Sequence, residues 1–138
     1  MIVYVDSSVL LRIALGQPDR LAEWESITRP ITSALAEVEC CRTLDRRRAA
    51  GLINPADHAE RRGLVLRLLE RMDRVDLTGA VMRRAADPFP TPLGTLDALH
   101  LATAILWGAG YGAMPIMATH DGDLARGARA MGLIAIGA

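Results

Sequence analysis

The chain has 138 residues, 51% of them apolar, and a formal net charge of zero at neutral pH. This length predicts one domain over residues 1–138 with a sizeable core, and the apolar content excludes a disordered segment. Every apolar run is shorter than the roughly 20 residues of a membrane span, and the chain opens on a predicted strand instead of a leader, so we expect a soluble cytoplasmic protein.

The first predicted element ends in a carboxylate. Residues 2–5 form a short apolar run rich in β-branched side chains, which predicts a buried strand that stops at Asp6. Either Ser7 or Ser8 is expected to cap the helix that follows over residues 7–15. Because the carboxyl ends of the strands form the ligand crevice of an open parallel sheet, Asp6 is predicted to lie where chemistry is usually done.

The middle of the chain is predicted to be mainly helical. Pro18 opens an expected helix over residues 19–27, and residues 30–32 form a short extended piece. The other elements expected here are helices over 34–50, 56–71 and 79–86 and a strand over 74–77. The apolar positions predicted for the first of these helices are Leu35, Val38, Cys41, Leu44 and Ala49. Cys40 and Cys41 are adjacent, which disfavours a disulfide or a metal pair and favours core packing.

The last third of the chain contains a second buried strand that ends in an acid. A proline-rich loop over residues 88–92 precedes a strongly apolar helix over 96–107, which Thr95 is expected to cap. Glycines then form a flexible connection to a strand over 116–119, followed by Asp121. A helix over 123–131 and a short strand over 133–136 complete the pattern. Alternating strands and helices predict a three-layer α/β/α domain with a mostly parallel, short-stranded central sheet.

Four acidic positions are not explained by surface ion pairing. Asp6 and Asp121 follow buried strands, and Asp97 lies in a helix that is apolar on nearly every side, with His100 one turn further on. Glu37 and Glu39 occupy the apolar first half of a long helix, so one of the two is expected to point inward. For Asp97, a helix-start charge near the positive end of the dipole is the alternative explanation.

A cluster of such acids predicts a bound cation. Two carboxylates about 5 Å apart repel by roughly 3 kcal/mol at an effective dielectric near 20, so a domain that keeps several together is expected to compensate them. Carboxylate ligands without cysteine suit magnesium or manganese instead of structural zinc. A divalent ion there polarises a phosphate oxygen and lowers the pKa of a bound water, which is the chemistry of phosphodiester hydrolysis.

Four sequence segments carry a family resemblance: VDSSVLL at the start, SALAEVECCR in the middle, GTLDALHLATA in the apolar helix and ATHDGDLARGARAMGL near the end. Together they resemble the PIN domain, specifically the VapC toxin ribonucleases of bacterial toxin–antitoxin pairs. The resemblance implies that Asp6, Glu39, Asp97 and Asp121 are both the catalytic residues and the metal ligands, with Glu37 as the alternative to Glu39 two residues earlier.

Other positions are assigned auxiliary roles by the same resemblance. Ser7 and Thr119 match small hydroxyl positions that orient ligands or phosphate, and Asp123 is either an auxiliary ligand or a helix-start acid. Arg42 either forms an intrahelical ion pair or contacts the substrate phosphate. His120 stands where the family often has tyrosine. His100 is interpreted as a packing or supporting residue near Asp97.

The resemblance implies a Mg²⁺-dependent endoribonuclease, with Mn²⁺ as a possible substitute, that acts on tRNA or another structured RNA. It also implies a VapB-type antitoxin partner and a homodimer, with no membrane association. The alternative function is a catalytically silent PIN-fold binding module, against which the four filled acidic positions argue. All sixteen basic residues are arginine, and the absence of lysine disfavours haloacid-dehalogenase-like phosphatases and response-regulator receiver domains, which need one.

Overall fold

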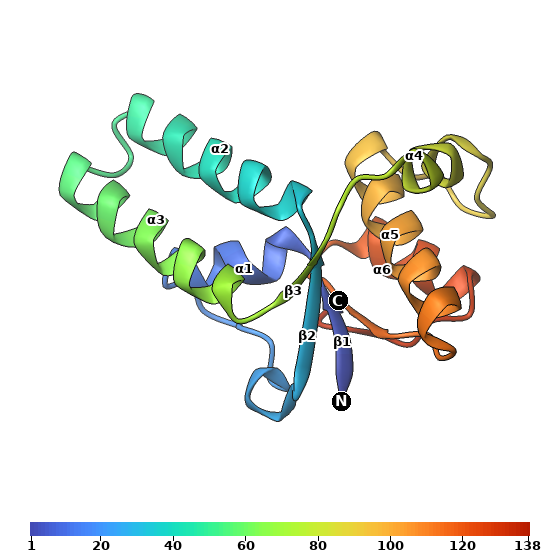
Figure 1. Ribbon diagram of the computed structural model, residues 1–138. Helices are drawn as coiled ribbons and strands as arrows, with labels where there is room; N and C mark the ends of the chain where they lie inside the picture. Colours follow the sequence, from blue (N-terminus) through green and yellow to red (C-terminus); the bar gives the residue numbers. More distant parts are fainter.

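The computed structural model describes all residues from 1 to 138 and consists of one parallel sheet with helices on both faces (Figure 1). The sheet has the order β3-β2-β1-β4-β5, and every neighbouring pair is parallel. Its strands are β1 (Ile2–Val5), β2 (Arg29–Ser33), β3 (Asp73–Val75), β4 (Ile116–Ala118) and β5 (Ala135–Ile136). The helices are α1 (Ser7–Ala14), α2 (Leu35–Ala49), α3 (Pro55–Glu70), α4 (Gly79–Ala86), α5 (Thr95–Tyr111) and α6 (Gly122–Ala130), with a short 3-10 turn at Trp24–Ser26.

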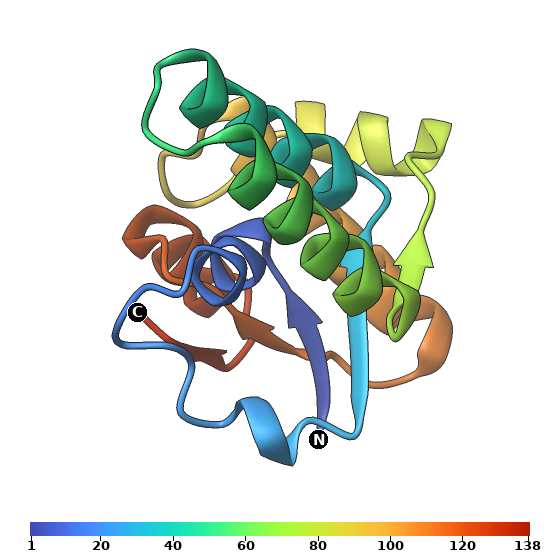
Figure 2. The same cartoon turned by 90° about the vertical axis from the view of Figure 1, so that its left-hand side faces the viewer.

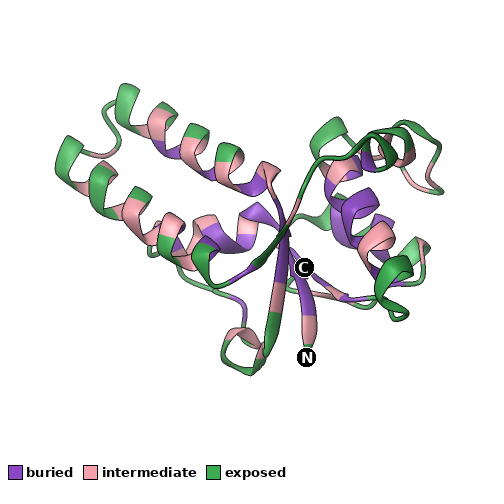
Figure 3. Cartoon of the chain, in the orientation of Figure 1, coloured by how far each residue is buried: buried purple, intermediate pink, exposed green.

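Two hydrophobic cores hold these layers together. Successive side chains of a strand point to opposite faces, so Val3 and Val5 of β1 join the core beneath α1, α2 and α3, whereas Tyr4 joins the core beneath α5 and α6. Burial is concentrated where these helices meet the sheet, and the outer faces and the loop around residues 76–80 are exposed (Figure 3). Seen from the side, α1, α2 and α3 lie in front of the sheet (Figure 2). The predicted three-layer fold is confirmed. No helix is both long enough and apolar enough to cross a membrane.

Strand pairing brings residues from the two ends of the sequence together at the carboxyl edge of the sheet, where the parallel strands end. β1 is the central strand and pairs with β4 in the register Val5↔Ala118. The backbone N–H of Asp6 extends this ladder by donating to the carbonyl of Ala118 at 3.0 Å. Because both strands run in the same direction, the residues that follow them, Asp6 and Thr119, emerge side by side.

Two predicted elements were wrong at glycine- and proline-rich segments. The helix expected over residues 19–27 is reduced to the turn at Trp24–Ser26. Its expected first residue, Asp19, has a left-handed backbone conformation with φ of 57° and so cannot begin a right-handed helix there. Conversely, α5 continues through Gly108 and ends at Gly112, whose φ is 94°. A Cβ at Gly108 would lie 2.7 Å from the sulfur of Met114, so this glycine allows close packing inside the helix instead of ending it.

The buried face of α2 also differs from the prediction. The residues buried in α2 are Ala36, Cys40 and Leu44, whereas Val38 is 55% exposed. The predicted and the observed buried positions both have helical spacing. The smaller side chains of Ala36 and Cys40 lie on the side of α2 that packs against the rest of the protein, where they let the helix approach it closely. Cys40 and Cys41 are free thiols, as expected, and Cys40 is buried in the core.

Helix starts were only partly predicted. Asp6 itself caps α1 by accepting from the backbone N–H of Ser8, in place of the expected Ser7 or Ser8. Likewise Gly94, not Thr95, precedes α5 and offers no side-chain cap. Since an N-cap aspartate lies at the positive end of a helix, the structure places the Asp6 carboxylate where the α1 dipole stabilises its charge.

Candidate active site

The carboxyl edge of the sheet is where the acids predicted from the sequence come together. Asp6 follows β1, Asp121 follows β4, Asp97 lies in the first turn of α5, and Glu39 lies in α2. The site is therefore assembled from four segments that are distant in sequence. Its centre is Asp6, a residue that is only 4% exposed.

Hydroxyl groups hold the Asp6 carboxylate in place. The Ser8 hydroxyl donates to Oδ2 at 2.6 Å, and the Thr119 hydroxyl donates to the same oxygen at 2.9 Å. The Ser7 hydroxyl makes a longer contact of 3.4 Å with Oδ1. These three hydroxyl groups therefore orient the buried Asp6 side chain from three sides.

Thr119 connects Asp6 to Asp121. Its Oγ1 donates to Asp6 and accepts from the backbone N–H of Asp121 at 3.0 Å. The Asp121 side chain caps α6, because its Oδ1 accepts from the backbone N–H groups of Asp123 and Leu124 at 2.9 and 3.0 Å. Asp121 as a residue is exposed, so this carboxylate stands at the solvent side of the site.

A buried chain of side chains connects Glu39 to the core. His100 Nε2 contacts Glu39 Oε1 at 2.5 Å and Asp6 Oδ1 at 3.4 Å, and its Nδ1 is 2.7 Å from the Tyr4 hydroxyl. Both His100 and Tyr4 are fully buried. When Nε2 carries the proton that Glu39 accepts, Nδ1 of a neutral ring accepts from Tyr4, so the tyrosine fixes which nitrogen faces the acids.

The same contacts set the charge of the histidine. Burial alone lowers the pKa of His100, but the hydrogen bond to Glu39 and the negative charges of Asp6, Glu39 and Asp97 outweigh it and raise that pKa. Burial and the charge of Asp6 hold the pKa of Tyr4 well above its usual value, so the phenol stays neutral. The raised pKa favours the protonated form of His100, in which both ring nitrogens donate, Nε2 to Glu39 and Nδ1 to the Tyr4 hydroxyl.

Asp97 shows that the negative charges are not fully balanced. Burial, together with the charges of Asp121 and Asp6, raises the pKa of Asp97 to about 6. No arginine forms a salt bridge with Asp6, Asp97 or Asp121. The ionised form of Asp97, in the first turn of α5, is thus disfavoured by the acids around it. A charge that served only to stabilise the start of the helix would not need such neighbours.

The remaining predicted positions lie around this cluster or away from it. Glu37 points away and contacts Arg74 at 3.4 Å, whereas Glu39 faces Asp6 and His100. Asp123 is exposed and pairs with Arg126 at 2.8 Å, and Arg42 pairs with Asp45 at 3.1 Å within α2. His120 turns from the acids, with Nδ1 2.9 Å from the carbonyl of Gly137.

The chemistry of the donors fits a hard divalent cation. Asp6, Glu39, Asp97 and Asp121 offer carboxylate oxygens alone, with no thiolate nearby, and oxygen-only sets suit Mg²⁺ or Mn²⁺. Burial and the charges of Asp121 and Asp6 together raise the pKa of Asp97, and a cation would relieve the part that comes from repulsion. In the structure no three acids, histidines or cysteines are arranged as a metal-holding group.

Comparison with known proteins identifies the family. The model of the PIN domain matches residues 3–130, which is most of the chain. The chain belongs to the PIN-domain family. Among curated proteins it is 34% identical to Ribonuclease VapC35 of Mycobacterium tuberculosis, over 97% of this chain and 95% of that protein. It is also 30% identical to Ribonuclease VapC46 of the same organism, with the same coverage. This PIN-domain protein is therefore a member of the VapC ribonucleases, as its sequence motifs indicated.

Solved structures agree on the fold. The structure of FitAB bound to an IR36 DNA fragment has a TM-score of 0.70 at 14% identity, covering 98% of this chain and 94% of that one. VapBC2 from Rickettsia felis, bound to a DNA fragment from its promoter, has a TM-score of 0.68 at 12% identity, covering 98% and 97%. At these identities the two structures show the shared fold alone.

Several side chains at the site had no assigned role in the sequence. Ser8 was considered only as a helix cap, yet it contacts Asp6, and it accepts from the backbone N–H of His120 at 2.9 Å. Tyr4 looked like an ordinary strand residue. Its position two residues before Asp6 could have indicated a place at the site, because alternate residues of a strand share a face.

Proposed function

We propose that this protein is a magnesium-dependent endoribonuclease that hydrolyses RNA phosphodiester bonds and acts as the toxin of a VapBC-type pair. The observation that carries the proposal is the convergence of Asp6, Glu39, Asp97 and Asp121 on one edge of the sheet with unbalanced negative charge. Membership of the VapC ribonucleases supports RNA as the substrate.

The residues of this chain have separable parts in such a reaction. Asp6, Asp97 and Asp121 would hold Mg²⁺ through their carboxylates, with Glu39 as the fourth acid. When bound, the ion supplies Lewis-acid polarisation of a phosphate oxygen and lowers the pKa of a water that attacks the phosphorus. Thr119 and Ser8 keep Asp6 oriented. His100 keeps Glu39 turned toward Asp6.

Metal-dependent cleavage by the Asp97→Asn variant tests this function. Asparagine keeps the shape of the side chain but removes a charged oxygen, and the loss of metal-dependent catalysis is expected to be roughly a thousandfold. The measurement is the cleavage rate of total tRNA in Mg²⁺ and in EDTA. Asp73→Asn is the matched control, because Asp73 is exposed at the other edge of the sheet.

Two outcomes would contradict the proposal. Full cleavage by Asp97→Asn in Mg²⁺ would remove this acid from the mechanism. If calorimetry of the parent detected no binding of Mg²⁺ or Mn²⁺, a silent PIN-fold binding module would be the better description of the protein.

A VapB-type antitoxin is the proposed protein partner, because the structural neighbours include toxin–antitoxin complexes. A groove of about 270 Å³ beside Glu39 has apolar walls at Leu35, Val38 and Leu96 and cationic ones at Arg42 and Arg46. A segment with apolar and acidic side chains suits that lining. Co-purification with the product of a neighbouring short reading frame, followed by inhibition of cleavage, tests it. The proposed homodimer is tested by analytical ultracentrifugation.

A further inference from the structure

A second groove lies on the other side of α2 and has a different character. It measures about 260 Å³, and seven of its nine lining residues are polar or charged, the other two being Leu11 and Leu15. Its walls include Arg12 of α1, Arg47 and Thr43 of α2, and Ser8 and Asp121 of the acid cluster. Thr43 also lines the apolar groove beside Glu39, so α2 separates the two. One end of the polar groove is therefore the solvent side of the candidate active site.

The two arginines of this groove lack carboxylate partners. Five arginines of the chain form salt bridges, among them Arg29 with Asp73 and Arg126 with Asp123, and neither arginine of this groove belongs to that set. Arg47 makes no salt bridge, and Arg12 uses only Nη1, which donates to the carbonyl of Asp19 at 3.0 Å. The guanidinium groups thus retain donors for an anion, and planar guanidinium groups match phosphate geometry.

The backbone around Asp19 helps to hold Arg12 in this position. Asp19 has φ of 57° and is the one residue other than glycine with a positive φ. Such a conformation is maintained only where surrounding contacts determine it, and its carbonyl is the group that fixes Arg12. Two cations from different helices are in this way directed at one groove.

We propose that the Arg12–Arg47 groove is a phosphate-binding subsite that holds an RNA phosphate next to the one being cleaved. This inference rests on the proposed ribonuclease function. RNA carries a phosphate at every nucleotide, so a strand whose scissile phosphate lies at Asp6 and Asp121 must place a neighbouring phosphate beside them. An acidic peptide fits less well, because its carboxylates would be repelled by those of Asp121 and Asp6. An RNA phosphate would instead share with these acids the divalent cation that they are proposed to hold.

Salt-dependent RNA binding tests the subsite independently of any preferred sequence, since phosphate contacts carry no sequence information. The probe is a fluorescein-labelled 12-nucleotide single-stranded RNA of mixed sequence, and fluorescence anisotropy gives its affinity in EDTA between 50 and 200 mM salt. Arg12→Gln and Arg47→Gln are each expected to weaken binding about fivefold and to lower the slope of log K against log salt by about 0.7. The double variant is expected to lose about 25-fold.

Matched controls separate a phosphate contact from a change in folding. Arg62→Gln removes an exposed arginine of α3 that lines neither groove, and it should bind like the parent. Arg47→Lys should recover most of the salt slope, because it keeps the charge. If Arg12→Gln unfolds, Arg47→Gln carries the test alone, because the Arg47 side chain makes no hydrogen bond in the structure.

The outcomes distinguish the subsite from the function. If the parent cleaves RNA in Mg²⁺ but the arginine variants bind with the parent's affinity and slope, the subsite is wrong and the ribonuclease stands. If the parent cleaves nothing while the variants lose affinity as expected, the subsite stands as an RNA contact and the nuclease is wrong. Variants that keep RNA affinity but lose the antitoxin would make the groove a protein-docking site, contrary to the proposal.

Discussion

Charged side chains are paired at the amino edge of the sheet, where the strands begin, whereas the acids of the candidate active site are left without arginine partners at the carboxyl edge, where the strands end. At the amino edge, Arg29 pairs with Asp73 at 2.9 Å and lies 5.4 Å from the ring of Trp107 and 5.2 Å from that of Tyr111. At the carboxyl edge, the Asp97 carboxyl lies among other acids, and no arginine forms a salt bridge with it. Arg29 is thus neutralised within the chain, whereas the acids are left to be neutralised by something else.

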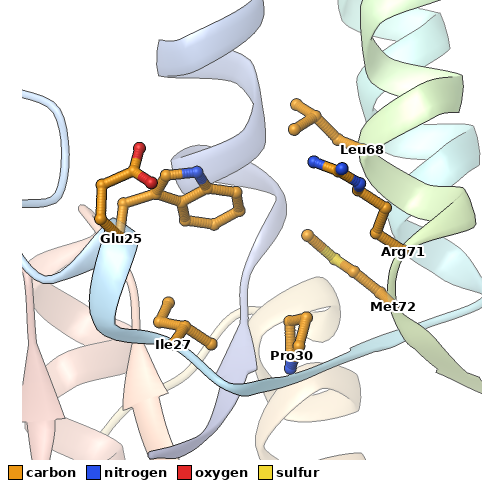
Figure 4. Close-up of a pocket in the computed structure, with 7 residues that line it drawn as sticks. Glu25, Ile27, Pro30, Leu68, Arg71 and Met72 are labelled. Atoms are coloured by element: carbon orange, nitrogen blue, oxygen red, sulfur yellow. The ribbon is translucent and has the colours of Figure 1, made fainter.

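The amino edge also contains a cavity that gives a useful contrast. It measures about 290 Å³ and is bounded by Trp24, Ile27, Pro30, Leu68 and Met72, with the exposed side chains of Glu25 and Arg71 at its side (Figure 4). Its two charged side chains are exposed and of opposite sign, so this cavity carries no excess charge, in contrast to the acids of the carboxyl edge. Pocket volume alone is therefore a weaker guide to a functional site in this molecule than unbalanced charge.

After the loss expected for Asp97→Asn, the largest expected effect separates two glutamates that stand two residues apart. Glu39→Gln removes the acid that contacts His100 and is expected to lower kcat/KM for RNA about a hundredfold. Glu37→Gln is the matched control and should leave cleavage unchanged, because Glu37 lies beside Arg74. Initial rates on the same RNA decide the matter. Equal losses in the two variants would show that the acids at this edge were assigned incorrectly.

A smaller effect is expected from the buried tyrosine. Tyr4→Phe removes the hydroxyl that contacts His100 Nδ1 while keeping the ring in the core, so kcat/KM and Mn²⁺ affinity are expected to fall about tenfold. Calorimetric titration with Mn²⁺ provides a readout that a purely structural role would leave unchanged. Tyr111→Phe, at the amino edge, is the control. Parent-like metal affinity in Tyr4→Phe would exclude a positioning role for the Tyr4–His100 contact.

At the amino edge itself we expect almost no effect. Asp73→Asn breaks the ion pair with Arg29, in which both side chains are about half exposed, and is expected to lower the free energy of unfolding by about 1 kcal/mol or less. RNA cleavage should be unchanged. Urea denaturation gives the first quantity and an RNA cleavage assay the second. A large loss of cleavage would show that the amino edge contributes to the candidate active site, so that the two edges are not independent.

The smallest effect concerns the two thiols. Burial raises the pKa of Cys40, which packs under the carboxyl edge, so this thiol is expected to stay unreactive in the folded protein. Cys41 is partly exposed and should be modified first. Titration with a thiol-reactive dye should give one fast equivalent and a second only on unfolding, and Cys41→Ser should remove the fast one without altering cleavage.

Much of this organisation was predictable because it follows from local chemistry. Asp6 and Asp121 were expected at strand ends, and parallel pairing of β1 with β4 brings those ends together. Asp97 was identified because a charge is conspicuous in an apolar helix. These predictions depended on residue type and period alone, which act over a few residues.

The parts that could not be predicted depend on contacts between distant segments. Whether Glu37 or Glu39 faces Asp6 depends on the rotation of α2, and the structure buries Ala36 and Cys40 where larger apolar residues were expected inside. The Tyr4–His100 contact joins residues 96 positions apart. The left-handed conformation of Asp19 is likewise fixed by its surroundings, and the residue types of its segment did not predict it.

The hydrogen bonds of Thr119 have a consequence for how this protein is made. Asp6 is translated 113 residues before Thr119, whose hydroxyl orients it, and the acid beside Thr119 follows later still. A growing chain on the ribosome therefore holds only part of the site until β4 and the start of α6 have emerged. The acids that would act on RNA are brought together only after more than a hundred further residues have been added to the chain beyond the first of them.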